Sequence, residues 1–136
     1  MLFFESIEAH PADWSALIFK DKVITFGELR QTVDNWAAYL QAKGLQKGER
    51  VGLFSKNCPE FVAAYHAIVK AGGVVVPINF MLSPTETSFI IKDASVKMMF
   101  VQEVIDLEAA LAKRGCDPVE QITFAEISAA PEALPA

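Results

Sequence analysis

Lys56 is the residue best placed in this sequence to bind an anion. It lies in Ser55-Lys56-Asn57, between a predicted strand at residues 50–55 and a predicted helix that begins with Pro59. The free amides of a first helical turn and a nearby ammonium group can together hold a phosphate or a carboxylate. We favour the simpler interpretation, helix capping beside a solvated lysine, because isolated lysines are mostly found on protein surfaces.

The paired glycines Gly72-Gly73 are a second candidate for phosphate binding. A phosphate loop runs from a strand into a helix, so that free amides and the helix dipole face the anion. Gly72-Gly73 runs the other way, from a predicted helix into a predicted strand. We therefore interpret the pair as a helix stop, the ordinary use of glycine at a helix C-terminus.

The two histidines and two cysteines do not form a metal-binding or nucleophilic set. His66 lies among apolar residues of a predicted helix, where helical spacing brings it no second ligand, so we predict a packed or hydrogen-bonded core residue. His10 lies beside Pro11 and is expected to be solvated. Cys58 and Cys116 are far apart and have no CxxC or histidine partner, so neither a disulfide nor a zinc site is predicted.

Carboxylates and tryptophans give no catalytic arrangement either. Glu103, Asp106 and Glu108 are followed by two basic residues, the charge order that a helix dipole prefers, and we interpret them as a solvated helix face. Trp14 and Trp36 could suggest an aromatic cage, but Trp36 falls on the apolar stripe of its helix and is predicted to be core. No serine has an adjacent base. The residues alone therefore predict no catalytic, cofactor-binding or metal-ligating residue in this chain.

The elements that would position these residues alternate between strand and helix. A hairpin at 16–19 and 22–25 is followed in turn by helix, strand, helix, strand, helix, strand, helix and strand, at residues 26–43, 50–55, 59–71, 74–78, 84–93, 97–101, 103–114 and 121–124. The capping boxes Thr25/Glu28 and Ser83/Glu86 mark two of the helix starts. This alternation predicts an α/β fold, a doubly wound, mainly parallel sheet with helices on both faces.

Several segments are apolar on more than one side. Residues 61–71 predict a buried helix, so Phe61→Ala is expected to cost about 3 to 5 kcal/mol. The run 74–76 predicts a strand covered on both faces, with Pro77 at its end or edge. In the helix 84–93 we expect Phe89 and its neighbour Ile90 to point inward.

Composition and charge exclude some classes of protein. The chain has 136 residues, with 12 Lys and Arg against 17 Asp and Glu, and its net charge of −5 lacks the basic footprint of a nucleic-acid-binding protein. No apolar run reaches the roughly 18 residues of a transmembrane segment, and no basic residue precedes Lys20 as in a signal peptide. We therefore expect a cytoplasmic protein. Its hydrophobic content of 52% is more than a lone domain of this size needs, which predicts an exposed apolar face.

Five segments in a fixed order carry a family resemblance. They are Thr25-Phe26-Gly27-Glu28-Leu29, Gly44-Leu45-Gln46-Lys47-Gly48-Glu49-Arg50-Val51, Asn57-Cys58-Pro59-Glu60-Phe61, Lys70-Ala71-Gly72-Gly73-Val74-Val75-Val76-Pro77-Ile78-Asn79 and Ser83-Pro84-Thr85-Glu86. Together they closely resemble the beginning of the AMP-forming acyl-CoA ligases, relatives of firefly luciferase and of peptide-synthetase adenylation domains. The resemblance covers about residues 16–101 and is specific for the superfamily, not for a substrate.

The resemblance implies the N-terminal subdomain of a larger enzyme, with residues 1–128 in the α/β subdomain and 129–136 as an Ala/Pro-rich linker or chain end. Family members react a carboxylic acid with ATP and magnesium to give an acyl-adenylate, and then transfer the acyl group to coenzyme A. For the parent of this chain we expect the acid to be a fatty acid. The family's phosphate loop, which ends in Pro-Lys-Gly, and its Tyr-Gly-x-Thr-Glu and Thr-Gly-Asp segments do not occur here. The chain alone is therefore expected to bind none of these cofactors and to be inactive, and Asn79 is expected to be structural.

The expected partners are the remainder of the ligase chain or a second copy in a homodimer. The alternative is a free-standing, non-catalytic α/β binding or interaction module that has kept the ligase scaffold.

Overall fold

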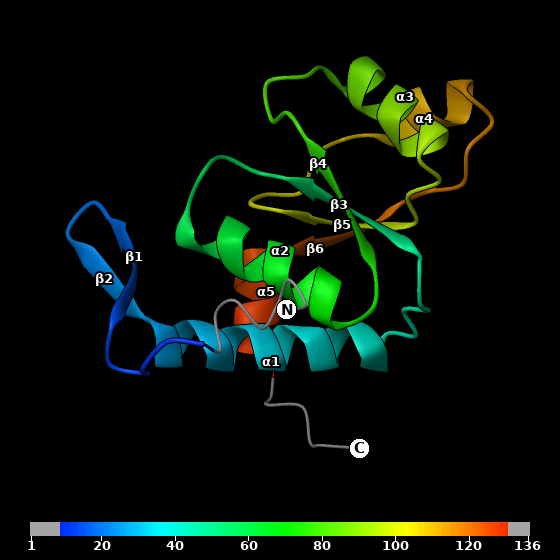
Figure 1. Ribbon diagram of the computed structural model, residues 1–136. Helices are drawn as coiled ribbons and strands as arrows, with labels where there is room; N and C mark the ends of the chain where they lie inside the picture. The colour runs from blue at the N-terminus through cyan, green and yellow to red at the C-terminus, as the bar shows by residue number, and fades with distance from the viewer. Residues whose placement is uncertain (1–8, 131–136) are drawn as a thin grey trace.

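The computed structural model describes residues 9–130. Along the chain the elements are β1 (Ser15–Phe19), β2 (Lys22–Thr25), α1 (Phe26–Ala42), β3 (Arg50–Phe54), α2 (Pro59–Lys70), β4 (Val74–Ile78), α3 (Pro84–Asp93), β5 (Met98–Val101), α4 (Glu108–Lys113), β6 (Glu120–Thr123) and α5 (Phe124–Ala129). Strands β3 to β6 form a parallel sheet in the order β4-β3-β5-β6. Helices α1, α2 and α5 lie on one face of this sheet, and α3 and α4 lie on the other (Figure 1). The predicted doubly wound α/β fold is confirmed.

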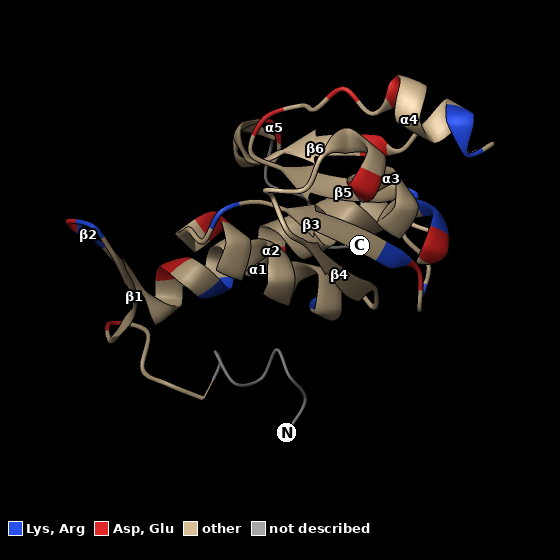
Figure 2. Ribbon diagram, turned by 90° about the horizontal axis from the view of Figure 1, so that it is seen from above, with Lys and Arg blue, Asp and Glu red and all other residues tan. Residues whose placement is uncertain are grey.

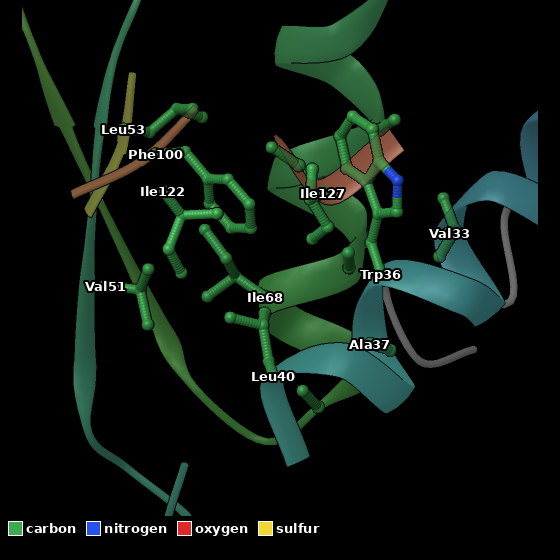
Figure 3. Close-up of a cluster of buried hydrophobic side chains, with 14 of the residues drawn as sticks. Val33, Trp36, Ala37, Leu40, Val51, Leu53, Ile68, Phe100, Ile122 and Ile127 are labelled. Carbon is green, nitrogen blue, oxygen red and sulfur yellow. The ribbon is translucent and has the colours of Figure 1, made fainter. Parts of the chain in front are cut away.

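Side chains alternate between the two faces of the sheet along each strand, and they contribute to two separate hydrophobic cores. Val51, Leu53 and Phe100 join the cluster beneath α1, α2 and α5, whereas Met99 and Val101 join the cluster beneath α3 and α4. Figure 3 shows the first cluster, in which side chains of the sheet meet those of α1 and α2. The central strands are thus apolar because both of their faces are buried.

Three aromatic rings organise the larger core. Trp36 of α1 stacks on Phe124 with ring centres 5.9 Å apart and an interplanar angle of 8°, and on Phe100 at 6.0 Å. Trp36 is only 4% exposed, which confirms the prediction that it is a core residue. The stack joins α1, β5 and the start of α5 in one contact.

The helix ends follow the signals in the sequence. The Thr25 hydroxyl accepts a hydrogen bond from the Glu28 amide at 3.2 Å, and the Ser83 hydroxyl accepts one from the Glu86 amide at 3.1 Å. In both cases the glutamate reaches back to the cap amide, so both predicted capping boxes are confirmed. Gly72 adopts φ 94° directly after α2, which confirms the helix stop.

The prediction of one helix over 103–114 is wrong, because α4 begins only at Glu108. The side chain of Gln121 in β6 explains the difference. Its Oε1 accepts from the Ile105 amide at 2.9 Å and its Nε2 donates to the Ile105 carbonyl at 2.8 Å, which occupies both backbone groups that a helix would use. Glu103 and Asp106 therefore lie on an irregular loop and not on a helix face.

Helix α5 was not predicted from the sequence. It begins directly after β6, where the Thr123 hydroxyl accepts from the Glu126 amide at 3.0 Å. The helix ends at Ala129, and the last part of the predicted 129–136 linker lies outside the described residues.

Two expectations about burial are only partly confirmed. Ile90 packs against the second core as predicted, but Phe89 is 56% exposed, and the buried residues of α3 are Thr87, Ser88 and Ile91. In β4, Val75 packs against the first core and Val76 against the second, but β4 is the edge of the sheet, as expected for Pro77, and Val74 is 47% exposed. Helix α2 has no exposed residue between 61 and 70, but Phe61 is only half-buried.

Strands β1 and β2 form an antiparallel hairpin of their own, as predicted, which projects from the N-terminal end of α1 (Figure 1). Charged residues lie on the helices, on the loops and at the tip of this hairpin (Figure 2). No helix among residues 9–130 is long and apolar enough to cross a membrane.

Candidate functional site

The candidate ligand site of this fold lies at the carboxyl ends of β3 and β5. The two strands are neighbours, but the chain leads from β3 to β4 on one side and from β5 to β6 on the other. Ligands of open parallel sheets bind where the strand order reverses in this way. A cavity of about 400 Å³ lies there, lined by Phe54, Ser55, Lys56, Phe80, Gln102, Glu103 and Ile105.

Lys56 and Phe80 form the polar and aromatic walls of this cavity. The Lys56 ammonium group lies 5.7 Å from the centre of the Phe80 ring, within the range of a cation–π contact. The Lys56 amide donates to the Gln102 side-chain oxygen at 3.2 Å, which joins the loop after β3 to the loop after β5. The lining thus offers one cation, two aromatic rings and one side-chain amide, with the Glu103 carboxylate beside them.

Ser55 lines this cavity and Cys58 lies beside Ser55, but the two are not arranged as a nucleophile and base. Ser55 is 6% exposed, and its hydroxyl donates to the Lys56 carbonyl at 2.8 Å. The Cys58 sulfur lies 3.6 Å from the Ser55 oxygen at the N-cap of α2. The serine proton is therefore directed at a carbonyl oxygen, which cannot act as the base that a nucleophilic serine needs.

These side chains do not fit a nucleoside triphosphate with its metal ion. A polyphosphate is held by several converging amides and cations, whereas Lys56 is the only cation that lines this cavity and Glu103 opposes it. Among residues 9–130 no three His, Cys, Asp or Glu side chains are grouped so that they could hold a metal ion. We therefore derive no chemical step from this cavity alone.

Asn79 has a structural contact close to the cavity. Its side-chain oxygen accepts from the Met81 amide at 2.9 Å, and its carbonyl accepts from the Leu82 amide at 3.0 Å. These bonds form a turn between β4 and α3. The turn places Phe80 beside Lys56.

The histidines lie away from this cavity. His66 is 9% exposed in the core, as predicted, and burial lowers its pKa. His10 is exposed but not simply solvated, since its ring lies 4.6 Å from the Phe26 ring and 6.0 Å from the Trp14 ring. Trp14 is 56% exposed and stacks beside His10, whereas Trp36 stacks on Phe100 and Phe124, so the two tryptophans belong to different ring clusters.

A larger cavity, about 670 Å³, lies between α4 and β6. Its wall is mostly apolar, with Val104, Leu107 and Leu111, and it also includes Cys116 and Gln121. Gln121 is engaged with the Ile105 backbone, and the charged side chains of the wall, Asp106 and Glu108, are both carboxylates, so the described wall contains no cation to pair with them. Volume alone does not make this cavity the better candidate, because specific sites need convergent polar groups.

From the sequence, Lys56 was the residue best placed to bind an anion, although a solvated lysine was the favoured interpretation, and Phe80 and Gln102 were missed as its neighbours. Both residues follow the last residues of parallel strands, and the carboxyl ends of parallel strands meet at one edge of the sheet. That positional signal was available once the strands had been predicted.

Comparison with known proteins places the fold in a family. The family model described as AMP-binding enzyme matches residues 3–135. The chain belongs to the AMP-binding enzyme family. It is 31% identical over 115 residues to the long-chain-fatty-acid–CoA ligase of Bacillus subtilis, and 33% identical over 103 residues to 4-hydroxybutyrate–CoA ligase 2 of Metallosphaera sedula. The AMP-binding fold also matches the crystal structure of apo MatB from Rhodopseudomonas palustris with a TM-score of 0.80 and 26% identity.

This AMP-binding chain corresponds to a part of its relatives. The matches cover 85% and 76% of this chain but only 20% and 19% of the two ligases, and 98% of this chain but 29% of MatB. The chain thus spans about a fifth of the length of the curated ligases. The cavity at β3 and β5 belongs to this fifth.

Proposed function

We propose that this chain is the N-terminal portion of an AMP-forming acyl-CoA ligase. The parent enzyme would activate a carboxylic acid with ATP and magnesium to give an acyl-adenylate, and then transfer the acyl group to coenzyme A. The acid that we propose is a fatty acid. The observation that carries the proposal is the family match over residues 3–135 together with relatives that are CoA ligases. A long-chain fatty acid and 4-hydroxybutyrate appear in the names of those relatives, and both are carboxylic acids.

The role that we assign to the chain is that of a scaffold. Its described residues form a four-stranded parallel sheet with two buried cores. The cavity at the carboxyl ends of β3 and β5 provides one ammonium group and no convergent set of donors. We therefore propose that no catalytic, cofactor-binding or metal-ligating residue lies in this chain, and that ATP, magnesium and coenzyme A are bound by the rest of the enzyme.

The boundaries and the location are part of the same proposal. We assign residues 1–128 to the subdomain and residues 129–136 to a linker or chain end. We place the parent enzyme in the cytoplasm, which fits the absence of a cysteine framework in the sequence.

A chimeric ligase tests the proposal. The chain is fused in place of the matched fifth of the Bacillus subtilis long-chain-fatty-acid–CoA ligase, and fatty-acid-dependent exchange of pyrophosphate into ATP is measured. The matched segment of the Metallosphaera sedula ligase, placed at the same position, shows whether the Bacillus enzyme accepts a foreign segment. We expect exchange by both chimeras and none by the 136-residue chain alone.

Two results would oppose the proposal. Exchange by the chain alone would show that it carries catalytic residues. An inactive chimera beside an active Metallosphaera control would favour the alternative, a non-catalytic binding or interaction module that has kept the ligase scaffold.

A further inference from the structure

The hairpin β1–β2 is apolar on both of its faces. Leu17 and Ile24 form one cross-strand pair, and both pack against the larger core. Ile18 and Val23 form the next pair, and because side chains alternate along a strand this pair lies on the opposite face. Ile18 is 73% exposed and Val23 is 50% exposed.

Such a pattern is typical of a strand covered on both sides. A hairpin with one solvated face alternates between apolar and polar residues, but Ser15–Phe19 contains no charged residue. In the part of the chain that the structure describes, only the inner face is covered. A two-stranded hairpin is marginally stable by itself, so a second covering layer would stabilise it.

A groove connects this hairpin with the end of α5. The groove, about 190 Å³ in volume, is lined by Lys22 and Ile24 of β2, by residues of α1 and α2, and by Ser128 of α5. Ala130, the last described residue, leaves α5 with an extended backbone at φ −64° and ψ 145°. The hairpin and the last turn of α5 thus line one groove.

We propose that the outer face of the hairpin, formed by Ile18 and Val23, is a docking surface for the ligase body, by which we mean the four-fifths of a ligase outside the matched segment. The inference rests on the proposed function. A covalently joined body fits this surface better than a second copy of the chain. A free dimer needs about 800 Å² per partner, far more than two side chains supply, whereas a joined body gains from its high effective concentration.

The double substitution Ile18→Lys/Val23→Lys tests this surface in the chimeric ligase. A lysine buried without a partner is strongly disfavoured, so we expect about tenfold or greater loss of pyrophosphate exchange. In the isolated chain both positions face solvent, so the urea midpoint and the circular dichroism spectrum should not change. The milder pair Ile18→Thr/Val23→Thr keeps β-branched side chains and should give a smaller loss in the same direction.

Ala109→Lys is the control. Ala109 is exposed on α4, on the opposite face of the sheet from α1, α2 and α5, and its substitution should leave exchange unchanged. Full exchange by the hairpin variants in an active chimera would overturn the inference and leave the proposed function intact. An inactive unsubstituted chimera would instead remove the proposed function, and the inference with it. A dimer of the isolated chain that the double substitution dissociates would assign the surface to a second copy and would also overturn the inference.

Discussion

Gly52 of β3 lies directly opposite Met99 of β5 in the parallel sheet. The backbones and side chains are so close that a Cβ atom at position 52 would lie 2.9 Å from the Met99 Cβ, and 3.3 Å from a methyl group of Val96. Glycine is therefore required here by space, not by backbone conformation. The contact places the two central strands of the sheet in register beneath α3 and α4.

We expect Gly52→Ala to destabilise the chain by about 1 to 3 kcal/mol, because the added methyl group meets a Cβ atom that cannot rotate away. Urea unfolding followed by circular dichroism measures the loss. Val74→Ala on the exposed edge strand is the control and should change the free energy of unfolding by less than about 1 kcal/mol. A neutral Gly52→Ala variant would show that β3 and β5 are further apart than described.

Phe100→Ala is expected to cost about 3 to 5 kcal/mol, because Phe100 is fully buried and stacked on both Trp36 and Phe124. The same loss was expected for Phe61 from the sequence, but Phe61 is only half-buried, and we now expect about half of it. Denaturant melts of the two variants give the comparison directly. Equal losses at the two positions would contradict the described burial.

Thr25→Ala removes the hydroxyl that caps α1 and should cost about 1 kcal/mol. Thr25→Ser keeps an oxygen at this position and should recover most of the loss. Thermal unfolding of the two variants beside the unsubstituted chain separates the hydrogen bond from other effects of the substitution. A loss as large for serine as for alanine would mean that the cap does not form.

The same cap predicts a dependence on pH. Hydrogen bonds from the Thr25 backbone amide and then from its hydroxyl lower the pKa of Glu28 below its ordinary value of 4.5. The folded state therefore holds this proton less well than the unfolded state, and the contribution of Glu28 is complete above about pH 4.5 and is lost as pH falls through the lower folded pKa. Glu28→Gln should weaken the dependence of the unfolding free energy on pH in this acid range. An unchanged slope of unfolding free energy against pH would contradict the assignment.

His66 gives a second pH effect in a different range. Burial lowers its pKa below the ordinary value of 6.5, so between the two values the unfolded chain binds a proton that the folded chain does not. The free energy of unfolding should be constant above about pH 6.5 and should fall below it. Urea melts at about pH 7.5 and about pH 5.5 measure the difference, which should shrink in His66→Gln and persist in His10→Gln.

Local signals in the sequence were sufficient to predict most of the fold. Thr25/Glu28 and Ser83/Glu86 marked helix starts because a capping box depends only on residues three positions apart. The irregular segment before α4 could not be predicted in this way. It depends on Gln121, which lies 16 residues away along the chain and binds the backbone of Ile105.

Burial was harder to predict where it depends on strand order. The run at Val74 looked like a central strand, but periodicity alone does not reveal that β4 is the edge of the sheet. The candidate site was predicted only in part for the same reason. The place of Lys56 between strand and helix raised the anion-binding alternative, which was not the favoured interpretation, whereas Phe80 and Gln102 become its neighbours through the order β4-β3-β5.

The most direct test of the whole account is pyrophosphate exchange by the chimera that carries this chain in place of the matched fifth of the Bacillus subtilis ligase. If the chain is the N-terminal portion of an AMP-forming acyl-CoA ligase, the chimera will exchange pyrophosphate into ATP only when a carboxylic acid is present, and the chain alone will not. A folded chimera without carboxylate-dependent exchange, beside an active Metallosphaera control, would contradict the account.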